Sequence, residues 1–153
     1  MPAVLDLPHR LAHSYSALAR GLLETSESDY PYEPFTAPFD PDRDFTSETL
    51  RAALHLASFW DIYSSNDDAS GDHWFADKIA WCRDPESGDC PDDAVVYEHL
   101  QRAMQATLDG PLEAWYVTAW NKDLPRFYYS WLYIFGRVKG GGLAGLYARL
   151  VWT

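Results

Sequence analysis

The sequence predicts a mainly α protein: a compact single-domain bundle of five or six helices with long acidic loops. The chain has 153 residues, enough for one domain with a sizeable core, and 47% of them are hydrophobic. Many of these hydrophobic residues recur at helical spacing in segments that begin at capping residues. No internal repeat or low-complexity linker interrupts the chain. We therefore expect one acidic helical domain over residues 1–153.

Two helices are predicted in the first 63 residues, with an irregular segment between them. The first covers residues 6–23, where Asp6 can cap the helix and leucines recur at helical spacing. The second covers residues 46–63, and apolar residues on most of its circumference predict that it is central and buried. Residues 24–45 carry four prolines and an acidic majority. We expect no regular element there, but an extended segment that lies over the surface.

Four more helices are predicted in the rest of the chain. Asp92 or Asp93 is expected to cap the second of them, and Gly110 to mark its end. Asp123, with Pro125 just behind it, is expected to open the last. The predicted ranges are 73–82, 94–108, 111–121 and 123–138.

The segment over residues 127–138 fits two structures. Its aromatic and β-branched residues favour a strand, so "FYYSWLYIF" suits one arm of a hairpin that turns at Gly140–Gly142. Residues such as Trp131, Ile134 and Val138, however, keep helical spacing. This spacing favours the helix, and a C-terminal hairpin is kept as the alternative.

The glycines that follow this segment fit the pattern G-x-G-x-x-G. They are Gly140, Gly142 and Gly145, with Arg137 and Lys139 just before them. A dinucleotide site also needs a strand before this pattern, a full helix after it and an acidic residue about 20 positions on. The sequence up to residue 153 leaves no room for these features. We therefore expect a flexible turn that reverses the chain, and no cofactor.

Two sets of residues have spacings that occur at metal sites, but neither set is complete. His9 and His13 are four positions apart on one face of the first helix, without the glutamate that the zinc-protease helix places between them. Asp40, Asp42 and Asp44 have calcium-loop spacing, yet the glycine and glutamate that an EF-hand requires further along are missing. The sequence therefore predicts no bound metal.

The cysteine content and the apolar runs predict a cytoplasmic protein. Cys82 and Cys90 flank a polar turn and can close a small disulfide loop, although in a reducing cytoplasm such pairs are more often free thiols. The N-terminus lacks the basic start and apolar core of a signal peptide. The longest apolar run is far shorter than the roughly 20 residues that span a bilayer. We expect no membrane segment.

The net charge of −11 is unevenly distributed. Residues 1–100 contain 20 acidic and 6 basic residues, whereas residues 101–153 contain 3 acidic and 6 basic residues. An acidic surface repels nucleic acid and anionic membranes and attracts basic partners. Direct binding of nucleic acid is therefore not expected.

These features predict a non-catalytic acidic binding protein that inhibits or sequesters a basic protein, namely a toxin, a nuclease or a nucleic-acid-handling complex. An immunity-type or phage anti-defence inhibitor is the most specific form of this prediction. Acidic loops would steer the encounter, and aromatic side chains among them would anchor it. The residues predicted to face the partner are Tyr30, Tyr32, Phe39, Asp40, Asp42, Asp44, Asp67, Asp68, Asp72 and Trp74.

The alternative is a small helical enzyme or a small-molecule binder. Its pocket would lie between helices and be lined by Trp60, Trp74, Trp81, His55 and neighbouring tyrosines. Taken alone, His55 is expected to be a hydrogen-bonded core residue. The sequence contains no nucleophile motif, and its paired carboxylates cluster in loops where charge runs are usually solvated.

Overall fold

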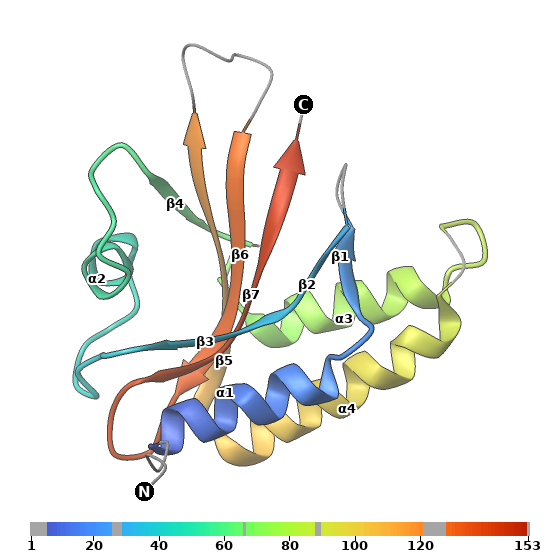
Figure 1. Ribbon diagram of the computed structural model, residues 1–153, viewed down its shortest axis with the longest axis horizontal. Coiled ribbons are helices and arrows are strands. Elements are labelled where there is room, and N and C mark those ends of the chain that lie inside the picture. Colours follow the sequence, from blue (N-terminus) through green and yellow to red (C-terminus); the bar gives the residue numbers. More distant parts are fainter. Residues whose placement is uncertain (1–5, 26–28, 66, 88–89, 121–127, 153) are drawn as a thin grey trace, which may run out of the picture.

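The computed structural model describes residues 6–25, 29–65, 67–87, 90–120 and 128–152 (Figure 1). These residues form four helices and seven strands, so the prediction of a mainly α bundle is wrong, and the fold is mixed α/β. The helices are α1 (Leu7–Leu18), α2 (Ser47–Ala53), α3 (Gly71–Arg83) and α4 (Pro91–Thr107). The strands are β1 (Leu23–Thr25), β2 (Asp29–Pro31), β3 (Glu33–Ala37), β4 (Asp61–Ser64), β5 (Asp109–Trp120), β6 (Tyr128–Arg137) and β7 (Leu143–Trp152).

Five strands form one antiparallel sheet in the order β3-β7-β6-β5-β4, and β1 pairs with β2 in a separate hairpin. Strand β6 lies in the middle of the sheet and pairs with β7 along its full length. The turn between them contains Gly140, Gly141 and Gly142, all with positive φ angles that favour glycine. The glycines therefore reverse the chain, as predicted. The C-terminal hairpin, kept as the alternative, is the structure that forms.

The helices predicted over residues 111–121 and 123–138 are instead strands β5 and β6. Along β5, Leu112 and Ala114 are buried in the core on one side of the sheet, whereas Trp115 packs on the other side. Side chains on both faces of this sheet are covered, so apolar and polar residues do not alternate cleanly along its strands. In the sequence, the continuous apolar run of such a strand has the same pattern as a buried helix. The predicted helix start at Asp123 and Pro125 lies outside the described residues.

The helix predicted over residues 46–63 forms only in its first part. Thr46 caps α2, because its side chain accepts a hydrogen bond from the backbone amide of Thr49, but the helix ends at Ala53. His55 has a φ of 54° and is exposed, so the prediction that it lies in the core is wrong. The chain then forms strand β4, whose isoleucine and tyrosine favour extended backbone.

Residues 24–45 are more regular than the prediction of an irregular segment. They contain parts of three short strands, β1, β2 and β3, before the chain becomes irregular and mostly exposed. Pro34 is tolerated in β3 because this strand lies at the edge of the sheet and pairs only with β7. Pro34 thus marks an edge strand of the sheet.

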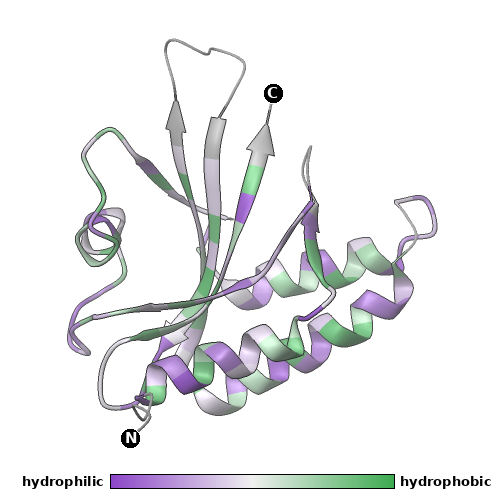
Figure 2. Ribbon diagram, viewed as in Figure 1, coloured by the Kyte–Doolittle hydropathy of each residue, from purple (hydrophilic) through white to green (hydrophobic). Residues whose placement is uncertain are grey.

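Helices α1, α3 and α4 pack on one face of the sheet, and α2 packs on the other (Figure 1). Helices α1, α3 and α4 were predicted close to where they occur. Asp6 caps α1, because its side chain accepts a hydrogen bond from the backbone amide of His9. Hydrophobic residues concentrate where the strands and helices meet (Figure 2). The largest buried side chains include Tyr15, Phe75, Leu100, Leu132 and Leu146. Within the described residues, no helix is long and apolar enough to cross a membrane.

Candidate functional site

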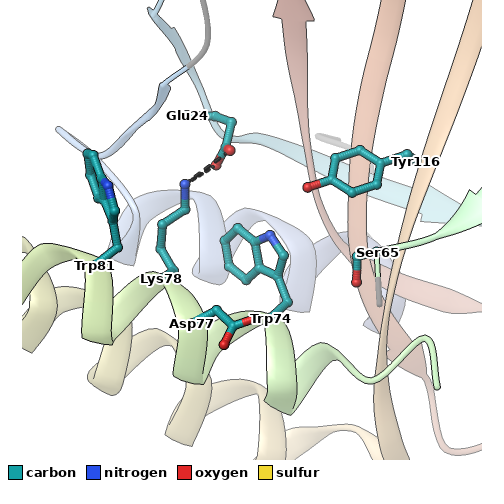
Figure 3. A pocket seen from close by; sticks show the side chains of 7 residues that line it. All are labelled: Glu24, Ser65, Trp74, Asp77, Lys78, Trp81 and Tyr116. Carbon is teal, nitrogen blue, oxygen red and sulfur yellow. Dashed lines mark hydrogen bonds and ion pairs between the residues drawn. The ribbon is translucent and has the colours of Figure 1, made fainter. Parts of the chain in front are cut away.

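A hollow of about 420 Å³ lies between helix α3, strand β1 and strand β5, and we term it the α3 cleft (Figure 3). Helix α3 contributes four of its lining side chains, because residues three, four and seven positions apart share one face of a helix. Strand β1, the segment after β4 and strand β5 contribute the others. The lining residues are Glu24, Ser65, Trp74, Asp77, Lys78, Trp81 and Tyr116.

A buried ion pair lies at the side of the α3 cleft. The Nζ of Lys78 is 3.0 Å from each carboxylate oxygen of Glu24, and the two side chains are only 14% and 7% exposed. Tyr32 also donates a hydrogen bond to Glu24, and its hydroxyl lies 2.9 Å from that of Tyr97. A buried ion pair needs such additional hydrogen bonds, because both charges lose their hydration. The pair joins helix α3 to strand β1.

Two indole rings surround the ammonium of Lys78. Its Nζ lies 5.5 Å from the ring centroid of Trp74 and 5.8 Å from that of Trp81, which are cation–π distances. Trp74 is buried, whereas Trp81 is 41% exposed and lies at the mouth of the cleft. The cleft therefore combines a cation-binding arrangement with an exposed aromatic ring.

The wall formed by the sheet is also aromatic. Burial raises the pKa of Tyr116 to about 12, and a hydrogen bond with Trp74 acts in the opposite direction, so this phenol is neutral at physiological pH. Tyr63 stacks on Tyr116 with 5.5 Å between ring centroids and is half-exposed. Tyr116 thus provides an aromatic wall of the cleft, and Tyr63 of strand β4 packs against its ring.

A second hollow, of about 380 Å³, shares Lys78 and Trp81 with the α3 cleft. Its other lining residues are Gly21, Leu23, Asp29, Cys82, Cys90, Asp93 and Tyr97. Burial, with a hydrogen bond to Cys90, raises the pKa of the Cys82 thiol to about 12. Both cysteines are free thiols. Together the two hollows are lined by four carboxylates, from Glu24, Asp29, Asp77 and Asp93, and by one amine, from Lys78.

The aromatic residues predicted to face a partner lie in several environments. Tyr32 and Trp74 are buried in the core beside the α3 cleft, with 6.3 Å between their ring centroids. Tyr30 is half-buried, and its ring centroid lies 5.4 Å from the guanidinium carbon of Arg149. Phe39 is half-buried on the other side of the sheet, where it packs with α2. Only Trp74 among them lines the cleft.

The predicted acidic residues occupy two loops and one helix. Asp40, Asp42 and Asp44 are exposed in the loop before α2, and Asp67 and Asp68 are exposed in the loop before α3. Asp72, in the first turn of α3, is half-buried. Its Oδ1 accepts hydrogen bonds from Gln101 and Gln105, at 3.0 Å and 2.8 Å. This contact holds α3 against α4.

The structure brings together part of the alternative pocket. Trp74 and Trp81 line the same cleft, but Trp60 and His55 do not line it. Sequence reasoning missed Glu24, Lys78 and Tyr116. Lys78 was detectable, because it lies four residues after Trp74 and three before Trp81 on one helix face. Glu24 was not detectable, because its partner lies 54 residues away.

The sets of residues with metal-site spacing have protein partners in part. The Nδ1 of His9 lies 2.5 Å from Asp6, and its Nε2 lies 3.3 Å from the hydroxyl of Thr36. Among the described residues, no group of three or more histidine, cysteine, aspartate or glutamate side chains is arranged to hold a metal ion.

No known family model matches the sequence, and a comparison with curated proteins finds no similar chain. Any inference about function therefore rests on the geometry.

Proposed function

We propose that this protein is a non-catalytic binding protein that inhibits or sequesters a basic protein partner in the cytoplasm. An immunity-type or anti-defence inhibitor of a toxin, a nuclease or a nucleic-acid-handling complex has this activity. The partner docks over the two hollows on either side of Trp81. The exposed acids of the loops before α2 and α3 contribute a longer-range attraction.

The observation that carries this proposal is the imbalance of charge around Trp81. Four carboxylates and one amine line the two hollows, and the amine of Lys78 already neutralises the carboxylate of Glu24. The carboxylates of Asp29 and Asp77 are exposed and remain available to a partner. Clefts lined by one sign of charge concentrate groups of the opposite sign and accelerate their association. A basic protein surface fits this requirement.

Trp81 supplies the short-range part of the interaction. Tryptophan and arginine are the residues that most often dominate interface energies, when they become fully buried in the complex. The exposed indole of Trp81 lies between the two hollows, so a docked partner would cover it. Burial of this ring would limit dissociation, whereas the acids would mainly set the association rate.

A second candidate function is the binding of a small molecule. It is favoured by the size of the α3 cleft, about 420 Å³, which is within the range of ligand pockets. A small ligand could contact Trp74, Tyr116 and Asp77 together. This function differs from the first in that it needs no protein partner.

The proposed function is tested by affinity capture from the native host or its competitor, followed by mass spectrometry. The baits are the wild type, Trp81→Leu and, as a matched control, Phe59→Leu. Phe59 is 67% exposed and lies in the loop before β4, so its replacement also removes a surface ring but leaves both hollows intact. We expect a basic protein on the wild-type and Phe59→Leu baits that is displaced by salt and is depleted on Trp81→Leu. An acidic protein, or equal retention on all three baits, would contradict the proposal.

A further inference from the structure

The α3 cleft already binds one cation of its own chain. The ammonium of Lys78 is held by the carboxylate of Glu24 at 3.0 Å and by the faces of Trp74 and Trp81. The local environment therefore suits a positive charge in a site that water reaches poorly. Cation–π attraction strengthens when the cation is desolvated.

A second set of groups faces the open part of the cleft. Asp77 precedes Lys78 on α3 and also lines the cleft, and its side chain is 73% exposed. It lies near His73 of the same helix, with 3.5 Å between the Nε2 of His73 and the Oδ2 of Asp77. Trp81 presents exposed ring surface on one side, and Tyr116 forms the opposite wall. The exposed carboxylate of Asp77 thus lines the cleft with these rings and takes no part in the Glu24–Lys78 pair.

The shape of these groups distinguishes between types of cation. A guanidinium is planar, stacks on aromatic faces and donates two parallel hydrogen bonds to one carboxylate. An ammonium is a compact, strongly hydrated charge that cannot make this paired contact. An anion would be repelled by the carboxylates of Asp77 and Glu24, because the amine of Lys78 is already paired with Glu24.

We propose that the α3 cleft is a binding site for a guanidinium group, which stacks on Trp81 and pairs with the carboxylate of Asp77. The group is either an arginine side chain of the basic partner or part of a free small molecule. In the first case the inference rests on the proposed function and identifies the residue type that the partner inserts. The volume of about 420 Å³ accommodates such a group together with its aliphatic chain.

The test uses three small probes: N-acetyl-arginine methylamide, its neutral citrulline counterpart, in which a urea replaces the guanidinium, and its lysine counterpart, which carries an ammonium. Binding is followed by the NMR shifts of the tryptophan indole N–H groups. We expect saturable binding of the arginine probe, at least about tenfold tighter than the citrulline probe, and weaker binding of the lysine probe. Equal binding of the arginine and citrulline probes would overturn the inference.

Matched variants locate the binding site. Asp77→Asn and Trp81→Leu should each weaken binding of the arginine probe by about fivefold or more. Asp109→Asn and Phe59→Leu remove an exposed carboxylate and an exposed ring elsewhere, and should leave binding unchanged. Binding that is insensitive to both cleft variants would overturn the inference.

The two proposals fail in different ways. If the captured protein binds Trp81→Leu as tightly as the wild type while the arginine probe still requires Trp81, the proposed docking mode is wrong. The cleft then serves a free guanidinium compound, for which agmatine is the direct probe. If protein capture requires Trp81 but neither agmatine nor the arginine probe binds, the guanidinium inference is wrong and the proposed function stands.

Discussion

The ammonium of Lys78 lies 3.0 Å from both carboxylate oxygens of Glu24, and this pair connects helix α3 to strand β1 across 54 residues of sequence. It forms one side of the α3 cleft, and it also holds the hairpin of β1 and β2 against the helix. Removal of one partner leaves a buried charge unpaired, which is costly. The structure of the cleft therefore depends on this pair.

Lys78→Met should lower the free energy of unfolding by about 3 kcal/mol, because Glu24 remains buried without its counter-charge. Urea unfolding measures the change. The control is Arg83→Met, which breaks the more exposed Arg83–Glu98 pair and should cost no more than about 1 kcal/mol. If Lys78→Met costs no more than this control, the Glu24–Lys78 pair is not a buried structural contact.

Gly145→Ala should destabilise the protein by about 3 kcal/mol, because it overpacks the centre of the sheet. A Cβ at this position would lie 2.0 Å from the carbonyl oxygen of Ile134 and 2.6 Å from the Cα of Phe135. Lys139→Ala, in the adjacent exposed turn, should change stability by less than about 0.5 kcal/mol. Equal unfolding midpoints for these two variants would be inconsistent with the close approach of β6 and β7.

Glu113 should make stability depend on pH below neutrality. Burial raises the pKa of this carboxyl to about 7, although a hydrogen bond from Trp115 and the charge of Arg137 oppose the shift. The folded state then retains a proton that the unfolded state has released, so stability should fall as the pH rises from about 4.5 to about 7. Urea unfolding of the wild type and Glu113→Gln across this range measures the effect. The difference between the two proteins should vary with pH, and a constant difference would show that Glu113 titrates normally.

Oxidation should join Cys82 to Cys90. The two thiols share a hydrogen bond and line the same hollow, so their sulfur atoms lie next to each other. Diamide accepts the two hydrogens as the disulfide forms. Mass spectrometry of a peptide digest should detect a linked peptide in the wild type but not in Cys82→Ser. Formation of disulfide-linked dimers alone would show that the thiols are not adjacent.

Part of this fold follows from the sequence, and the reason lies in the environment of each element. Helices α1 and α3 have caps, at Asp6 and Ser70, and bury one side, so helical spacing is visible in their sequences. Strands β5, β6 and β7 have covered side chains on both faces, which hides the alternation that identifies a strand. Apolar residues such as Trp131 and Ile134 then matched helical spacing by coincidence.

The candidate site was less accessible to sequence reasoning. Trp74 and Trp81 were predicted to line a pocket between helices, together with Trp60 and His55, and the structure brings only the two first-named residues to the α3 cleft. Glu24 comes from a segment that was predicted to be irregular, and only the β1–β2 hairpin brings it to Lys78. Long-range pairing of this kind depends on the fold, which periodicity does not provide.

The most direct test of the account is the kinetics of binding to the captured partner over a salt series, for the wild type, Asp77→Lys and Asp44→Lys. Both variants make the same change of charge, but only Asp77 lines the α3 cleft. We expect association to slow as salt shortens the Debye length from about 10 Å at 0.1 M to about 3 Å at 1 M. Asp77→Lys should weaken binding at least about tenfold and also speed dissociation, whereas Asp44→Lys should change affinity by less than about threefold, mainly through the association rate. A salt-independent association rate, or equal effects of the two variants, would contradict an acidic cleft that docks a basic partner.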